Sequence, residues 1–313
     1  MLSYIIRRIV ATVPVLAFVA VFVFLLVHIT PVDPAVIIAG DYATLDQIAA
    51  IRSQMKLDRP LLEQFTTWTS HLMHADLGVS IFSQHQVSRL IGQRLEPTLL
   101  LALLATVMAV IIAVPLGVVA AYCAGGFFDR LVIGFSVLGF STPIFLVGYF
   151  LVYVFALGLD WFPAQGYTPL SKSLGGCLHS LLLPALAVAL LYVALIARMT
   201  RAVCLEVLAQ DYVRTAEAKG LGHRQVLLRH VLPNAAVPIA TVIGIGIAAM
   251  LGGVVVTETV FNVPGLGRLT ADAILRRDYP IIQGLMLLFT GIYVGVNLVI
   301  DLTYVLFDPR IRY

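Results

Sequence analysis

Charged residues are scarce in this chain of 313 residues. Only 12% of the residues are Asp, Glu, Lys or Arg, whereas 60% are hydrophobic. A soluble domain carries about 25% charged residues, so these charges are too few to cover the surface of a water-soluble globule. The same composition excludes intrinsic disorder, a coiled coil and collagen. The class that remains is a polytopic membrane protein.

Cysteine is scarce as well. The three cysteines, Cys123, Cys177 and Cys204, lie far apart in the sequence, so they form neither a disulfide framework nor a CxxC metal pair. The net charge of +3 is small and spread along the chain, which gives no reason to expect nucleic acid as a partner.

Six stretches without Asp, Glu, Lys or Arg are long enough to cross a bilayer, which takes about 20 apolar residues. Ten-residue alternating strands are absent, so a spanning barrel is excluded and the spans are expected to be helices. The sequence therefore predicts an all-α membrane protein with six transmembrane helices, at about 9–29, 99–122, 133–157, 180–200, 235–257 and 281–305.

Some spans contain residues that shape helices. An internal proline is expected to kink four of them, at Pro14, Pro115, Pro143 and Pro184, although proline is common in membrane helices generally. In the fifth span Gly244, Ala248 and Gly252 recur at every fourth position. They form a smooth face that predicts close packing with another helix, in this chain or in a partner subunit.

Basic residues predict the orientation. Arg7 and Arg8 precede the first span, and no small-x-small cleavage site precedes Thr30-Pro31, so the span is expected to be an uncleaved signal anchor. With the N-terminus inside, most basic residues of the short loops lie on the cytoplasmic side, which places both termini in the cytoplasm. The pair Arg276-Arg277 is the exception.

The polar segment 31–93 predicts an extracytoplasmic loop or cap with helix-like patches at 44–56 and 60–74. It contains His71, His74 and His85. A histidine pair at i and i+3 can bind a metal, but no carboxylate or cysteine completes a set at a recognisable spacing. We therefore expect surface histidines of unknown role and no metal site.

The loop 201–233 between the fourth and fifth spans is the most informative one. Asp211 is a good N-cap residue, and Tyr212 to Lys219 form two helical turns. Gly220 or Gly222 then ends the helix in a left-handed cap. The element is expected to be a short rigid helix on the inner membrane surface. It transmits force from a cytosolic partner, or it is only an amphipathic connector.

This loop resembles the EAA loop of ATP-binding-cassette (ABC) importer permeases. Gly220 and the pair Leu232-Pro233, which begins twelve residues later, carry the resemblance. The match is partial, because Arg214 stands where the family usually has Glu and Thr215 replaces the first alanine. The run Asp211-Tyr-Val-Arg-Thr-Ala-x-Ala-Lys-Gly-Leu221 is similar to the dipeptide, oligopeptide and nickel branch of that family.

Other motifs resemble the same branch and extend the similarity over nearly the whole chain. They are Tyr4-Ile-Ile-Arg-Arg8, Pro31-Val-Asp-Pro34, Asp76-Leu-Gly-x-Ser80, Glu258-Thr-Val-Phe-Asn-Val-Pro-Gly-Leu-Gly-Arg268, Arg277-Asp-Tyr-Pro280, Asn297 to Asp301 and Phe307-Asp-Pro-Arg-Ile-Arg312.

The resemblance implies a type I ABC importer permease fold in the bacterial cytoplasmic (inner) membrane. It also implies three kinds of partner: a homologous second permease, two cytosolic ABC ATPase subunits and an extracytoplasmic substrate-binding protein. The expected divisions are an N-terminal transmembrane helix (1–30), the extracytoplasmic cap (31–93), the core domain (94–305) with its coupling loop, and a cytoplasmic tail (306–313).

The resemblance places the contact with the ATPase on the short helix. The expected coupling residues are Asp211, Tyr212, Arg214, Thr215, Ala216, Glu217, Ala218, Lys219, Gly220 and Leu221. No G-x-x-x-x-G-K-[ST] phosphate loop occurs in the chain. We therefore expect no catalytic residue and no cofactor here, with ATP and Mg²⁺ bound by the partner ATPases.

Two further groups are candidates for function. The turn-rich stretch with Glu258, Phe261, Asn262, Pro264, Gly265 and Gly267 closes the pore on the outside or docks the binding protein. Asn297 and Asp301 lie one helical turn apart inside the last span. We expect Asp301 to be a structural cap or to form an ion pair, with Arg198 or Arg201 as the candidate partners, rather than to contact substrate.

Two other classes of function were weighed. A stand-alone secondary transporter usually carries ionisable residues near the midplane of the membrane, and none of the six spans does. An intramembrane enzyme needs a motif such as H-E-x-x-H or G-x-S-x-G, and neither occurs. Among substrates, dipeptides, oligopeptides, glutathione and nickel remain open, and the absence of an acidic or histidine cluster favours peptides.

Overall fold

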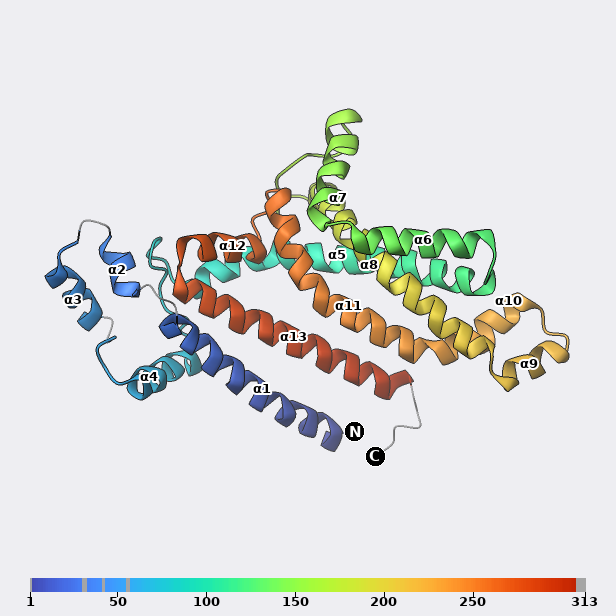
Figure 1. Ribbon diagram of the computed structural model, residues 1–313, viewed down its shortest axis with the longest axis horizontal. Coiled ribbons are helices and arrows are strands. Elements are labelled where there is room, and N and C mark those ends of the chain that lie inside the picture. Colours follow the sequence, from blue (N-terminus) through green and yellow to red (C-terminus); the bar gives the residue numbers. More distant parts are fainter. Residues whose placement is uncertain (1, 30–32, 41–42, 55–56, 308–313) are drawn as a thin grey trace. The chain divides into compact units, whose positions relative to one another are not determined.

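A computed structural model describes residues 2–307 of the chain except 30–32, 41–42 and 55–56 (Figure 1). In this part the only strand-like pairing is one isolated antiparallel bridge, between Val79 and Gln86. The chain divides into two compact units, described separately below. The core unit is Met1–Ile5, Pro97–Arg268 and Gly295–Tyr313, and the cap unit is Ile6–Glu96 and Leu269–Val294.

The helices follow one another along the chain, and the longest connections between them are 74–86 and 159–173. Their bounds are α1 Leu2–Ile29, α2 Pro34–Ala39, α3 Leu45–Gln54, α4 Leu61–Met73, α5 Val87–Tyr122, α6 Phe127–Ser141, α7 Ile144–Leu151, the π-helix η1 Val152–Gly158, α8 Leu174–Leu208, α9 Asp211–Ala218, α10 His223–Val226, the π-helix η2 Leu227–Val231, α11 Leu232–Val260, α12 Leu266–Arg276 and α13 Tyr279–Phe307.

Five helical segments of the described residues are long and apolar enough to span a membrane. They are Ile9–Ile29, Val87–Tyr122, Leu174–Leu208, His223–Met250 and Tyr279–Ile300. A bent pair, Phe127–Ser141 with Ile144–Gly158, makes six if it is counted as one span. The predicted all-α membrane fold is confirmed.

The third span is not the continuous helix predicted at 133–157. The two helices of the bent pair meet at 104°, so the chain breaks here instead of kinking. Thr142 has extended backbone angles (φ −94°, ψ 122°), and Pro143 precedes the first residue of α7. The proline ring disfavours helical geometry in the residue before it, which explains why the break falls at Thr142.

Helix α8 is the centre of the core unit. In its most apolar stretch 72% of the residues are buried, against 28% for the corresponding stretch of α11. Helices α6, α7 and α11 all pack against α8, and Gly139 of α6 lies so close that an added Cβ would be 2.8 Å from Ala194 Cβ. A helix that is apolar on all sides is expected to be surrounded in this way.

A stripe of small residues packs α5 in the core unit. Leu101, Ala105, Ala109 and Ala113 recur at every fourth position, and all four have 0% of their surface exposed. Gly117 continues the stripe, and an added Cβ there would lie 2.6 Å from the carbonyl oxygen of Ala197 in α8. Small side chains let two membrane helices approach this closely, which stabilises the pair through van der Waals contact.

The smooth face predicted on the fifth span is used in part within the chain. A Cβ added at Gly244 of α11 would lie 2.2 Å from the end of the Ile300 side chain in α13. Gly252, on the same face, has no such neighbour within 4 Å. The close packing predicted for Gly244 is therefore confirmed, whereas Gly252 is open among the residues that the structure describes.

A buried ion pair joins α6 to α8. Arg201 donates from Nε to Asp129 Oδ1 and from Nη2 to Oδ2, the latter at 2.7 Å, and the Gly125 N–H donates to Oδ2 at 2.8 Å. Only 2% of the surface of Asp129 is exposed. Such a two-pronged arginine–carboxylate contact is both strong and specific in geometry. Arg201 was expected as a partner of Asp301, whose side chain lies outside the described residues.

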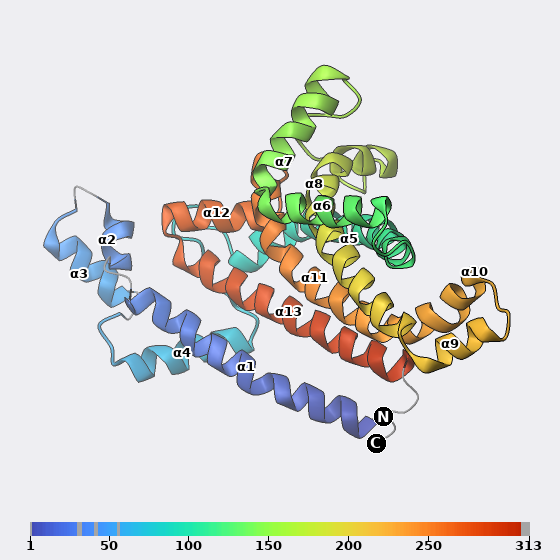
Figure 2. The ribbon, with the colours of Figure 1, turned by 45° about the vertical axis from the view of Figure 1, so that its right-hand side comes forward.

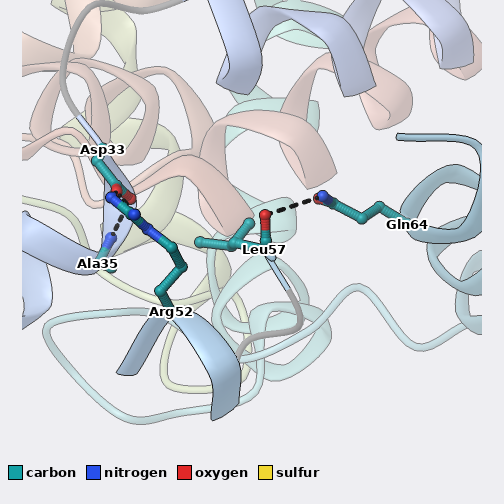
Figure 3. Close-up of polar contacts among 5 residues, drawn as sticks. All are labelled: Asp33, Ala35, Arg52, Leu57 and Gln64. Carbon is teal, nitrogen blue, oxygen red and sulfur yellow. Dashed lines mark hydrogen bonds and ion pairs between the residues drawn. The ribbon is translucent and has the colours of Figure 1, made fainter. Parts of the chain in front are cut away.

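The cap unit holds three short helices between the first span and α5. Helices α3 and α4 agree with the patches predicted at 44–56 and 60–74. Asp33 caps α2 by accepting a hydrogen bond from the Ala35 N–H at 2.9 Å, and Arg52 of α3 donates Nε–H to the same carboxylate at 3.0 Å (Figure 3). Side-chain caps of this kind stabilise short helices.

Loss of one partner of the buried ion pair has a predictable cost. Arg201→Met leaves the Asp129 carboxylate buried without its cation, and we expect the free energy of unfolding to fall by about 3–5 kcal/mol. The double variant Asp129→Leu, Arg201→Met removes both charges and is expected to recover most of this loss. Thermal unfolding in detergent measures both. A double variant as unstable as the single one would contradict the electrostatic explanation.

Candidate functional site

The short helix α9 begins one residue earlier than predicted. Gln210, with extended backbone, is the N-cap residue, and Asp211 is the first residue of the helix instead of its cap. In that position the carboxylate of Asp211 faces the positive end of the helix dipole. It also lies 3.7 Å from Nη1 of Arg214 one turn later. The sequence located the helix correctly and misassigned its cap.

Gly220 ends α9, one of the two endings that were predicted. Its φ of +83° is in the left-handed region, whereas Gly222 has φ −65° and begins α10. The Gly220 N–H donates to the carbonyl of Glu217, and the Leu221 N–H donates to the carbonyl of Ala216. These two bonds form a Schellman motif, which reverses the chain tightly after the helix.

The two faces of α9 differ sharply. Val213 is 1% and Ala216 6% exposed, and Val213 packs in a hydrophobic cluster with residues of α5, α8 and α11. Ala216 therefore faces the interior of the core unit and not a partner, while Ala218 is exposed. The other exposed residues among the expected coupling residues are Asp211, Tyr212, Arg214, Thr215, Glu217, Lys219 and Gly220; Leu221 is half-buried.

Helices α9 and α10 form a hairpin beyond the ends of α8 and α11 (Figures 1 and 2). His223 of α10 anchors it twice, because its ring lies edge-on 5.7 Å from that of Tyr122 in α5 and its Nδ1 lies 3.6 Å from Oε1 of Glu217. The π-helix η2 then leads into α11, and the Asn234 amide donates to the carbonyl of His230 at 2.7 Å. The hairpin is thus tied to three spans.

At the other end of α11, Glu258 is a buried carboxylate with 0% exposure. Its Oε1 accepts a hydrogen bond from the Thr98 hydroxyl at 2.5 Å, and its Oε2 accepts one from the Arg268 N–H at 3.0 Å. The Leu266 N–H in turn donates to Thr98 Oγ1 at 2.7 Å. Leu266 and Arg268 belong to the first turn of α12, so this carboxylate caps that helix from a distant position in the sequence.

Two glycines make room for the carboxylate. A Cβ added at Gly265 would lie 2.1 Å from Glu258 Oε1, and one at Gly267 would lie 2.4 Å from the Cα of Val255. Phe261 is also buried, at 2% exposure. Of the six residues proposed for an outer gate or docking surface, the structure leaves only Asn262 and Pro264 exposed. The other four hold the turn in place.

In the cap unit, a second buried carboxylate joins two of the motifs. Asp278, 2% exposed, accepts a hydrogen bond from the Ser80 hydroxyl at 2.5 Å and one from the Ile81 N–H at 3.2 Å. The segments Asp76–Ser80 and Arg277–Pro280, far apart in the sequence, are therefore in direct contact. Asp278 also precedes α13, so it fixes where that span begins.

The cap histidines have local partners. His71 Nδ1 lies 3.0 Å from Asp76 Oδ2, while His74 and His85 bond nearby carbonyls, those of Ser70 and Ser83. The role of these histidines as surface residues remains a prediction. Asn297 lies in α13, and the side chain of Asp301 and residues 308–313 lie outside the described residues, so the predictions on them are not tested.

Sequence reasoning missed the contacts of four residues, Thr98, Ser80, Asp278 and Asp129, although Ser80 and Asp278 lie in motifs that carry the family resemblance. Asp129 carried the clearest signal, because it is an acidic residue at the edge of an apolar stretch and needs a cation nearby. Thr98 and Ser80 gave none, since a lone hydroxyl next to a span is common. Only the fold shows that each one donates to a buried carboxylate.

Within the core unit, helices long enough to span a membrane pack against α8, and a helical hairpin connects α8 to α11. This architecture is that of a polytopic membrane protein. A family model described as "Binding-protein-dependent transport system inner membrane component" matches residues 113–313, and its N-terminal counterpart matches residues 1–102. The chain belongs to this family. It is a permease subunit of an ABC importer of the bacterial inner membrane, and the family implies a partner ATPase and a substrate-binding protein.

Sequence similarity to known permeases extends over the full length of the chain. The chain is 49% identical to a probable peptide ABC transporter permease, y4tP, of Sinorhizobium fredii, with 99% of each chain covered. It is 41% identical to the glutathione permease GsiC of Shigella flexneri, with 100% of each covered. Among solved structures, an inward-facing MetNI methionine ABC transporter matches with a TM-score of 0.60 at 15% identity, covering 71% of this chain and 97% of the other.

The close contact between Gly265 and the Glu258 carboxylate can be tested by adding a methyl group at the glycine. Gly265→Ala places a methyl group where Glu258 Oε1 lies, so we expect the protein to lose about 1–3 kcal/mol of stability. Gly252→Ala is the matched control, because that position is open and a helical glycine-to-alanine change gains about 0.5–1 kcal/mol. Thermal unfolding in detergent compares the two. Equal changes in the unfolding temperature of the two variants would show that the space at Gly265 is not needed to accommodate the Glu258 carboxylate.

The segment Asp76–Ser80 gives a pH dependence. The Gly78 N–H and the His71 ring both bond to Asp76 and lower the pKa of its carboxyl below the ordinary value. A lowered pKa in the folded state stabilises the fold above the unfolded pKa, and this stabilisation is lost as the pH falls through the folded pKa. The protection factors of the amides in 76–86, which correct for the slower intrinsic hydrogen exchange at low pH, are expected to fall on acidification, and less so in Asp76→Asn. Identical profiles in both proteins would refute this.

Proposed function

We propose that this chain forms half of the translocation pathway of an ATP-driven peptide importer, paired with a homologous second permease. Two cytosolic ATPase subunits bind ATP and Mg²⁺ and drive the cycle. Both termini of the chain then lie in the cytoplasm, as the distribution of basic residues predicts.

The observation that carries this proposal is the two-faced helix α9. On its inner face Val213 packs against the ends of the spans and Ala216 is buried, so a displacement of the helix displaces the span ends. Its outer face, with Tyr212, Ala218 and Lys219, is exposed in this chain. A short helix that packs against the ends of spanning helices and is exposed on its other face is suited to transmit the movement of a partner protein to those helices.

Peptides are the proposed substrates. The relatives that match end to end are named as peptide or glutathione permeases, which does not favour nickel. Asn262 and Pro264, the exposed tip of the turn held by Glu258, are the residues that we propose contact the substrate-binding protein. The buried members of that turn act by holding this tip in position.

Coupling is tested at Ala218. Ala218→Trp puts a large side chain on the exposed face of α9, so we expect unchanged folding and at least a tenfold loss of peptide uptake per ATP hydrolysed, equivalent to about 1.4 kcal/mol or more of lost coupling. The measurement is uptake and ATP hydrolysis by the complete transporter in liposomes.

Two comparisons keep this experiment specific. Ala50→Trp, on the exposed surface of α3 in the cap, is expected to leave uptake unchanged. Ala216→Trp points into the core and is expected to lower the unfolding temperature itself. Normal coupled uptake in Ala218→Trp would show that the outer face of α9 does not contact the ATPase.

A further inference from the structure

The cap unit contains a cavity that the transport function does not explain. Its volume is about 330 Å³, within the range of about 300–1,000 Å³ typical of small-molecule sites. It lies between the end of α1, the start of α13 and the helix α4. Apolar side chains form much of its wall, among them Phe24, Val27, Leu57, Trp68 and Pro280.

One polar atom in the wall has no partner among the described residues. Tyr279 is 5% exposed and lines the cavity, and its hydroxyl is buried without a hydrogen bond. This hydroxyl has almost no accessible surface, so a ligand in the cavity would contact the Tyr279 side chain without reaching the hydroxyl. The neighbouring polar groups are satisfied within the chain, since the Gln64 amide donates to the carbonyl of Leu57 (Figure 3) and that of Gln283 to the carbonyl of Val23. The exposed charges of the wall are therefore the groups with which a ligand would pair.

The wall also carries one charge of each sign. Arg59 and Glu63 both line the cavity and pair with each other, with about half of each side chain exposed (50% and 46%). An exposed pair of this kind is weak because water competes for both charges, so its partners can be exchanged at little cost. A ligand with an anionic and a cationic group would pair with both residues at once.

The position of the cavity identifies the ligand. Phe24, Val27 and His28 form the last turns of one membrane span, and Tyr279 and Gln283 form the first turn of another. The cavity thus lies at the boundary between the hydrocarbon and the water, where aromatic side chains such as Trp68 gather. On α1 next to it, Phe22, Leu25 and Ile29 form an exposed apolar stripe with 50%, 37% and 74% exposure.

We propose that this cavity binds a phospholipid with a zwitterionic headgroup. The phosphate pairs with Arg59 and the ammonium group with Glu63, and an acyl chain continues along the apolar stripe of α1. The cap is then fastened to the bilayer by a lipid as well as by its own helices.

Native mass spectrometry of the complete transporter tests the proposal. The protein is taken from nanodiscs that contain equal amounts of zwitterionic phosphatidylethanolamine and anionic phosphatidylglycerol. We expect one retained phosphatidylethanolamine for each copy of this chain. Thr67→Phe, which fills the cavity from α4, is expected to reduce the retained fraction about tenfold or more, equivalent to 1.4 kcal/mol.

Thr66→Phe is the matched control. Thr66 is the next residue of the same helix, its hydroxyl donates to the same Glu63 carbonyl as that of Thr67, and it does not line the cavity. It is expected to retain the lipid. The double variant Arg59→Gln, Glu63→Gln changes only exposed groups, so it folds normally and is expected to lose the headgroup preference.

Three results would overturn the proposal. The first is equal retention of lipid in Thr67→Phe and Thr66→Phe. The second is retention without preference between the two headgroups in the unmodified protein. The third is displacement of the retained molecule by a soluble hydrophobic dipeptide, which would assign the cavity to a zwitterionic solute and not to a lipid.

Discussion

The structure depends on carboxylates that are buried at the ends of apolar helices and fully bonded there. Glu258 holds the first turn of α12, Asp278 holds the start of α13, and Asp129 ties α6 to α8. In surroundings of low polarity an unpaired carboxylate is very unfavourable, so each of these groups enforces one geometry. Nonpolar packing brings the spans together, and these three residues decide how the spans end.

The hairpin with α9 and the turn before α12 each hold a few exposed residues in a fixed position, the first by hydrophobic packing and the second by buried hydrogen bonds. Around α9 the fixed part is hydrophobic, with Val213 and Ala216 in the core and the Schellman motif at Gly220 closing the helix. Around the turn the fixed part is polar, with Glu258 and Thr98 beneath Asn262 and Pro264. Both leave a small exposed surface on a rigid base, which is what contact with a partner protein requires.

Much of this was predictable from the sequence. The spans were identified by the length of their uncharged apolar stretches, because a helix needs about 20 apolar residues to cross a bilayer. Gly220 was one of two glycines expected to end α9, because few residues other than glycine adopt a positive φ. The break at Thr142 was missed because a proline inside an apolar run predicts a kink as readily as a break. The partners of Glu258 and Asp278 were not predictable, since they come from residues 160 and 198 positions away and only the tertiary fold brings them together.

The elbow at Thr142 has a consequence for movement. Thr142 lacks helical backbone angles, so the helix is interrupted there, whereas Pro115 and Pro184 lie inside continuous helices. The two arms are similar in length, with 15 residues in α6 and 8 plus 7 in α7 and η1. A change in the backbone angles of this one residue would therefore alter the angle between the arms without unwinding either of them, as at a hinge.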